Sequence, residues 1–229
     1  VLPQLGHVWR KLTELASMYG RMCEATSLPM LADADTGFGN VTNVARTVTL
    51  YEKAGVAGLF IEDQVFPKRC GHMAGKAVIP TADWIAKIKA ALDARHDPDF
   101  VIMARTDALA VEGLPAAIDR ACACVEAGAD MIFPEAMSSL EDYRKFKAAV
   151  KVPILANLTE FGSTPFYTTD ELRDAGVDIA LYCCGAYRAM NKAALNFYET
   201  VRREGTQKNI IDTLQSRADL YDYLSYHNY

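Results

Sequence analysis

The chain has 229 residues, of which 51% are hydrophobic and 23% carry a charged side chain. This composition is typical of a soluble globular protein and excludes an intrinsically disordered chain. The chain holds 24 Lys and Arg against 29 Asp and Glu, which gives a formal net charge of −5. A mildly acidic protein is a poor partner for nucleic acid or an anionic membrane, and the apolar runs are too short to span a bilayer.

A leading helix is predicted within residues 1–27, followed by six repeats over residues 28–205. Each repeat is a short apolar run, which predicts a buried strand, followed by an amphipathic stretch, which predicts a helix. Capping patterns at Ser138 and Thr168 mark the starts of two of these helices. The six predicted strands cover residues 30–34, 59–63, 100–104, 131–134, 152–156 and 179–182.

Repeated strand–helix units with fully apolar strands predict a parallel α/β sheet. Two arrangements fit the pattern, an open doubly wound sheet and a (β/α)8 barrel that would need two more strands ahead of Val1. No Pro-rich or Ser-rich linker divides the chain, so we predict one domain over residues 1–229. Residues 206–229 form its helical tail, and their many aromatic side chains predict packing on the barrel or on a neighbouring subunit.

The six cysteines do not have the spacing of a zinc site, and a chain of this length does not need disulfides to build a core. We interpret five of them as small buried hydrophobic residues in a reducing cytosol, and we therefore expect a cytoplasmic protein. Cys70 is set apart because it lies among charged residues. The others are Cys23, Cys122, Cys124, Cys183 and Cys184.

Acidic residues end the first two predicted strands, where functional residues of parallel α/β folds gather. Asp33 and Asp35 are two positions apart and should therefore point to the same site, and Glu62 ends the next strand. Three clustered carboxylates would repel one another without a cation. Ligation by oxygen alone suits Mg²⁺ or Mn²⁺, so the sequence predicts a divalent metal site here.

Polar residues also end the later strands, and several of them are cationic or amidic. Any one of these residues is most simply a solvated residue or a helix cap, but their convergence on one rim favours a site. The arginines predict an anionic substrate, because guanidinium groups bind carboxylates or phosphates in a bidentate manner. The residues in question are Arg105, Glu135, Asn157, Thr159 and Arg188, with Arg217 in the tail.

The long connection over residues 64–80 contains the sequence KRCGH at residues 68–72. A thiol flanked by two cations and an imidazole is expected to have a lowered pKa, which makes Cys70 a candidate nucleophile or general acid–base. Glycines at 71 and 75 allow bending, so the segment reads either as a lid or as a solvated surface loop. We favour the lid because the segment leaves directly from the acidic strand end.

Five motifs together resemble the isocitrate lyase and phosphoenolpyruvate mutase superfamily, over a stretch from about residue 28 to the end of the chain. They are DADTGFG at residues 33–39, IEDQ at 61–64, KRCGH at 68–72, ARTDA at 104–108 and FPEA at 133–136. NLTEFG at 157–162 and YRAMN at 187–191 are similar to the methylisocitrate lyase branch. The resemblance implies a (β/α)8 barrel, here apparently without its first two strands, and a homotetramer.

The resemblance also implies cleavage of 2-methylisocitrate to pyruvate and succinate, the lyase step of the methylcitrate cycle of propionate catabolism. By this analogy Asp33, Asp35 and Glu62 hold Mg²⁺, and Cys70 protonates the carbanion left by carbon–carbon cleavage. The catalytic residues carried over are Cys70, His72, Arg105 and Glu135. The substrate-binding residues carried over are Cys70, Gly71, Arg105, Glu135, Asn157, Thr159, Arg188 and Arg217.

Other interpretations stay open. The substrate could instead be isocitrate, 2,3-dimethylmalate or, by hydrolysis, oxaloacetate. A Ser-Gly-Gly loop of the family would precede Val1, and Gln4 stands where many members carry Asp. The sequence therefore also fits an inactive, lyase-like chain kept for assembly, although the intact metal and lid motifs favour an enzyme.

Overall fold

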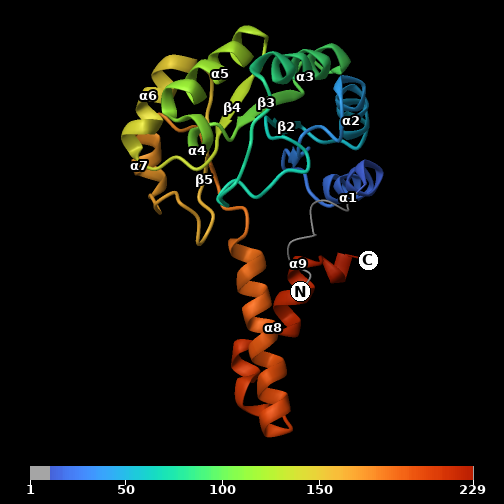
Figure 1. Cartoon of the computed structure of the whole chain (residues 1–229). Helices are drawn as coiled ribbons and strands as arrows, with labels where there is room; N and C mark the ends of the chain where they lie inside the picture. Colours follow the sequence, from blue (N-terminus) through green and yellow to red (C-terminus); the bar gives the residue numbers. More distant parts are fainter. Residues whose placement is uncertain (1–10, 229) are drawn as a thin grey trace. The chain divides into compact units, whose positions relative to one another are not determined.

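The computed structural model describes residues 11–228. The chain divides into two compact units, Val1–Tyr182 and Cys183–Tyr229, and each is described by itself. The first unit begins with α1 (Leu12–Glu24), which lies inside the predicted leading helix (Figure 1). Residues 1–10, which include Gln4 and part of the segment predicted to hold the leading helix, lie outside the described residues.

Among residues 11–228, six parallel strands follow one another in chain order, and each overlaps one of the six predicted apolar runs. Two hydrogen-bonded sheets are present, of four and two strands, and a parallel bridge between Ile132 and Ile154 connects their neighbouring strands. The predicted parallel α/β fold class is therefore confirmed. The strands are β1 (Leu31–Asp33), β2 (Gly58–Glu62), β3 (Val101–Thr106), β4 (Met131–Pro134), β5 (Leu155–Asn157) and β6 (Ile179–Leu181).

Helices connect the strands and cover one side of them (Figure 1). The predicted cap at Thr168 is confirmed, since its side chain accepts a hydrogen bond from the backbone N–H of Glu171. The cap predicted at Ser138 is wrong by one residue, because Ser139 accepts from Asp142 instead. The helices are α2 (Val41–Lys53), α3 (Thr81–Ala94), α4 (Leu109–Glu112), α5 (Leu114–Glu126), α6 (Leu140–Val150) and α7 (Thr169–Asp174).

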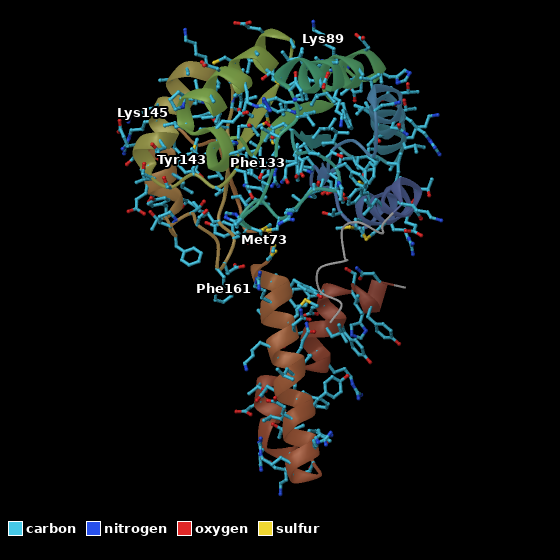
Figure 2. The ribbon with its side chains drawn as sticks, viewed as in Figure 1. Met73, Lys89, Phe133, Tyr143, Lys145 and Phe161 are labelled. Carbon is cyan, nitrogen blue, oxygen red and sulfur yellow. The ribbon has the colours of Figure 1, made fainter. Side chains whose placement is uncertain are left out.

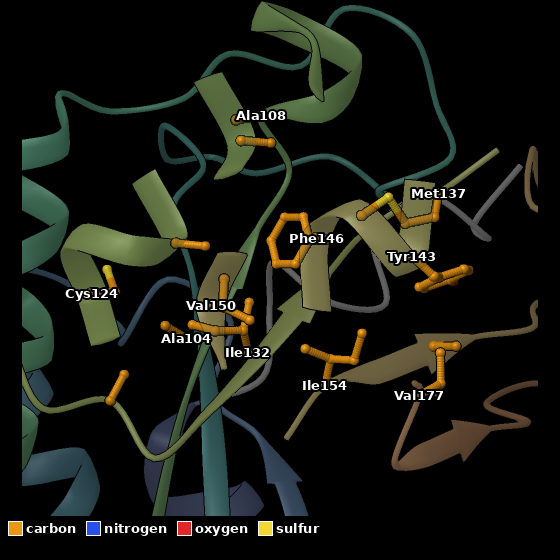
Figure 3. Packing of buried hydrophobic residues seen from close by; sticks show 14 of the residues in the cluster. Ala104, Ala108, Cys124, Ile132, Met137, Tyr143, Phe146, Val150, Ile154 and Val177 are labelled. Atoms are coloured by element: carbon orange, nitrogen blue, oxygen red, sulfur yellow. The ribbon is translucent and has the colours of Figure 1, made fainter. Parts of the chain in front are cut away.

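Both faces of the strands are apolar, which explains why the strands read as continuous hydrophobic runs. The outward face packs on the helices, and Figure 3 shows Tyr143 and Phe146 of α6 gathered with Ile132 and Ile154. The opposite face carries its own cluster, with one side chain from each of four strands. These inner residues are Phe60, Met103, Phe133 and Leu155.

The second unit consists of α8 (Gly185–Glu204), the 3₁₀ turn η1 (Lys208–Thr213), α9 (Arg217–Tyr223) and the 3₁₀ turn η2 (Tyr226–Asn228). Within α8, Thr200 is the one residue classed as buried. Large apolar side chains of the unit are exposed in the single chain, among them Tyr187, Met190, Tyr198, Tyr223 and Leu224. Within residues 11–228, no helix is both long and apolar enough to cross a membrane.

Candidate active site at the carboxyl ends of the strands

The strands project a set of polar residues on the same face as the inner apolar cluster. Residues two apart on a strand point the same way, so each polar residue lies directly beyond an inner apolar one. The pairs are Leu31 and Asp33, Phe60 and Glu62, Met103 and Arg105, Phe133 and Glu135, and Leu155 and Asn157. The alternation of the strands therefore brings five of the predicted site residues to one place.

Arg105 is the central cation of this group. Its Nε lies 3.0 Å from Asp107 Oδ2 and 3.4 Å from Glu62 Oε2, and its Nη2 lies 3.2 Å from Glu135 Oε1. The guanidinium also lies over the ring of Phe133, 4.8 Å from its centroid. Burial alone would lower the pKa of Arg105, but the three carboxylates outweigh it and raise the pKa, so the side chain stays charged.

A lysine of the lid segment, which the sequence did not mark as a site residue, pairs with the same Asp107 that pairs with Arg105. Lys76 Nζ lies 2.9 Å from Asp107 Oδ1 and also donates to the carbonyl of Gly71. Burial would raise the pKa of Asp107, but Arg105 and Lys76 together hold it below its usual value. Nothing in the sequence around Lys76 marks this role, because the contact joins two separate loops.

The three residues predicted to bind metal are connected through short contacts, and the lid supplies a cation to two of them. Lys68 Nζ lies 2.8 Å from Asp35 Oδ1 and 3.1 Å from Glu62 Oε2. The backbone N–H of Asp35 donates to Asp33 Oδ1 at 2.7 Å, which links the two aspartates. Burial raises the pKa of Glu62 to about 7, although Arg105 and Lys68 oppose the shift.

The donor chemistry of this cluster fits a divalent cation. Glu62 Oε1 is fully buried and has no hydrogen-bond partner in the described part of the chain, so a carboxylate oxygen is left without compensation. As the side chains stand, no three His, Cys, Asp or Glu among residues 11–228 surround a single point as metal ligands would. The ammonium of Lys68 occupies a cationic position between Asp35 and Glu62.

The lid segment, residues 64–80, is anchored at its base and reaches the site at its tip. Gln64 and Val78 form an antiparallel bridge, and the side chain of Gln64 makes hydrogen bonds of 2.8 Å and 3.0 Å to the backbone of Arg69. At the tip, a Cβ on Gly71 would overlap the side chains of Glu135 and Arg105. Only glycine therefore lets the lid approach these two residues so closely.

The residues that flank Cys70 in the sequence have partners elsewhere. Lys68 contacts the acidic cluster, and Arg69 Nη1 donates to the carbonyl of Ala74 at 3.3 Å. His72 lies between Glu135 and the loop that follows β5. Cys70 itself is exposed at the lid tip, next to Gly71.

The remaining predicted residues fall into both units. Asn157 Nδ2 lies 3.3 Å and 3.4 Å from the two carboxylate oxygens of Glu135, and Thr159 is buried in the turn that follows. Arg188 lies on α8 and Arg217 is the first residue of α9, so both belong to the second unit.

Asp63 differs from its neighbour Glu62 and takes no part in the site. Both acids end the apolar run predicted over residues 59–63, but consecutive residues of a strand point to opposite faces. Asp63 accepts hydrogen bonds from Thr106 Oγ1 at 2.8 Å and from the backbone of Asp107 at 2.8 Å, and it pairs with Arg120 Nε at 3.2 Å. Its role is structural.

Three comparisons with known proteins show the family of the chain. A family model described as phosphoenolpyruvate phosphomutase matches residues 10–202. The 2-methylisocitrate lyase of Escherichia coli (strain K12) is 57% identical over 229 residues, which is 100% of this chain and 77% of that protein.

Solved structures show the same relationship. A 2,3-dimethylmalate lyase, described as a member of the PEP mutase/isocitrate lyase superfamily, is 32% identical with a TM-score of 0.88, over 96% of this chain and 74% of that one. A phosphonopyruvate hydrolase in complex with oxalate and Mg²⁺ is 29% identical with a TM-score of 0.84, over 96% of this chain and 77% of that one. The chain therefore belongs to the phosphoenolpyruvate mutase/isocitrate lyase superfamily, and it is a lyase.

Proposed function

We propose that this chain cleaves 2-methylisocitrate to pyruvate and succinate and that it uses Mg²⁺, with Mn²⁺ as the alternative metal. The observation that carries the proposal is the carboxylate cluster of buried Glu62 with half-buried Asp33 and Asp35, beside Arg105 and under the tip of a lid. The name of the 57% identical relative supports the choice of substrate. Cytoplasmic propionate catabolism through the methylcitrate cycle is part of the same proposal.

Asp33, Asp35 and Glu62 would hold the metal ion, with Lys68 moving away from the cation position that it occupies. The Mg²⁺ in the complex of the related hydrolase with oxalate, a small dicarboxylate, supports this assignment. When bound, the ion would supply Lewis-acid stabilisation of negative charge that develops on substrate oxygen.

The side chains of the chain would bind the substrate and move its protons. Arg105, Asn157 and Thr159 would bind the carboxylates. A carboxylate of the site would accept the proton of the substrate hydroxyl, and the electron pair of that O–H bond would form the carbonyl of pyruvate. The carbon–carbon bond breaks in the same step, and its electron pair passes to the carbon next to a carboxylate. The thiol of Cys70 would give this carbon its proton, which completes succinate, while the closed lid keeps water from the carbanion.

Turnover is tested by coupled detection of pyruvate when the purified protein meets 2-methylisocitrate with Mg²⁺. We expect pyruvate to appear and EDTA to abolish the reaction, with activity restored by added Mg²⁺. Isocitrate, 2,3-dimethylmalate and oxaloacetate are assayed in parallel, because one methyl group changes selectivity by only about 1–3 kcal/mol. Faster turnover of one of these acids, or turnover that EDTA leaves unchanged, would refute the proposal.

A homo-oligomer, with a tetramer as the expected form, belongs to the same proposal. Its support is the set of exposed apolar side chains in the second unit, such as Tyr198, 70% exposed, and Tyr223, 81% exposed. Patches of this kind are typical of subunit interfaces.

We expect deletion of residues 215–229 to reduce the molar mass measured by light scattering after size exclusion, because the deletion removes several of these apolar side chains. Lys89→Glu, which changes an exposed lysine on α3, serves as the control and should leave the mass unchanged. If the deleted protein has the same number of subunits as the intact one, the tail does not hold the oligomer together.

A further inference from the structure

The side chain of His72, which is only 7% exposed, lies between Ser163 and Glu135. On one side the backbone N–H of Ser163 donates to Nδ1 at 3.1 Å, and Ser163 Oγ lies 3.3 Å from the same nitrogen. On the other side, Nε2 lies 3.3 Å from Glu135 Oε1, a close contact that does not have the geometry of a hydrogen bond. Figure 2 labels Met73, which follows His72, and Phe161, which precedes Gly162, and both lie on the same side of the first unit.

The hydrogen bond from Ser163 determines where the proton of the imidazole lies. A backbone N–H can only donate, so Nδ1 must accept and cannot carry a proton. The proton of a neutral His72 therefore lies on Nε2, which faces Glu135. We propose that the backbone of Ser163 fixes this tautomer, and that His72 is a positioning residue that joins the lid to Glu135 rather than the base that serves Cys70.

The turn is shaped to receive the ring. A Cβ on Gly162 would lie 2.7 Å from Nδ1 and 2.9 Å from Cε1 of His72, closer than real Cβ contacts allow. Gly162 does not have a positive φ, so its lack of a side chain is required by the ring of His72 and by Thr159 Cγ2, which a Cβ would approach to 2.8 Å, and not by the backbone. Gly162 and Ser163 thus make room for the ring of His72, which lies 91 residues before Ser163 in the chain.

The charges around the ring agree with a neutral imidazole. Burial lowers the pKa of His72, the cations of Lys76 and Arg105 act in the same direction, and Glu135 acts against them. Glu135 already receives Arg105 Nη2 at 3.2 Å and Asn157 Nδ2 at 3.3 Å, so its negative charge is compensated without a second cation. A proton on Nδ1 would face the N–H of Ser163.

A neutral ring in this setting has no nitrogen left for the thiol. Nδ1 is used by Ser163, and Nε2 already carries a proton. His72 can therefore hold Glu135 and the lid tip in place but cannot accept a proton from Cys70 while the lid is docked. This inference rests on the proposed function for its kinetic consequences, but the tautomer itself can be tested without any substrate.

The first experiment compares His72→Gln with His72→Ala in the 2-methylisocitrate assay. The glutamine amide can accept from Ser163 and donate to Glu135 but cannot exchange a proton, so we expect kcat within about tenfold of the parent protein. Alanine removes both contacts, and we expect kcat to fall about 100-fold or more. If His72 were a base, both variants would lose about 10²–10⁴-fold, and that result would overturn the proposal.

The second experiment reads the tautomer in protein labelled with ¹³C and ¹⁵N in histidine, by solid-state NMR without substrate. His72→Gln identifies the signals of His72, which we expect to show Nδ1 unprotonated and Nε2 protonated. Ser163→Ala keeps the backbone N–H and should preserve this pattern, whereas Ser163→Pro removes the donor and should change it.

Gly162→Ala, whose Cβ would displace the ring, is an independent variant in case the proline disturbs folding, and it should change the pattern as well. A protonated Nδ1 in the parent protein would refute the inference. Because no substrate is present, failure of the proposed activity and failure of this inference are distinguishable.

Discussion

Cys70→Ser is expected to lower kcat by about 10²–10⁴-fold while KM changes little, because proton donation is a transition-state role. The hydroxyl is close in size to the thiol and keeps the lid tip intact, but it is a much weaker acid. Steady-state pyruvate formation at several substrate concentrations separates the two constants.

Cys122→Ser is the matched control for this variant. Cys122 lies on α5 and packs against the hydrophobic cluster on the helix-covered face of the strands. We expect its kcat to equal that of the parent protein. Activity of the Cys70 variant equal to that of the Cys122 variant would remove the thiol from the mechanism.

Arg120→Met is expected to destabilise the fold by about 3–5 kcal/mol, the cost of breaking a buried ion pair by removing one partner. Arg120 Nε lies 3.2 Å from Asp63 Oδ2, and Nη1 donates to Thr81 Oγ1 at 2.8 Å. Its Nη2 donates to the carbonyl of Ile79 at 2.5 Å, at the end of the lid segment. The substitution leaves the carboxylate of Asp63 buried without its cation.

The free energy of unfolding from urea titrations measures this effect. Arg173→Met makes the same exchange in a pair that is exposed, since the side chains of Arg173 and Asp170 are 72% and 79% accessible. Exposed pairs contribute little, so we expect a change within about 0.5 kcal/mol. Similar stabilities for the two variants would show that the Asp63–Arg120 pair is not needed for the fold.

The sequence by itself determined the fold class and most of the site. Alternating apolar runs and amphipathic stretches depend only on local chain geometry, so six parallel strands could be predicted from periodicity. The carboxyl ends of parallel strands meet at one edge, so Asp33, Glu62, Arg105, Glu135 and Asn157 could be grouped before any coordinate was known.

Only the tertiary structure decided which neighbours these residues have. Glu62 and Asp63 are adjacent and chemically alike, yet one faces the site and the other pairs with Arg120, because the strand register sets the face. The contacts of the lid segment also depend on the tertiary structure. Lys68, Lys76 and His72 contact side chains or backbone groups of other loops.

The contact between His72 and Ser163 joins positions about 90 residues apart, and no local pattern encodes it. Such contacts depend on the packing of whole strands and helices, which brings separate loops to the same edge of the sheet. Periodicity therefore indicates where a site forms, while long-range packing decides which donor meets which acceptor within it.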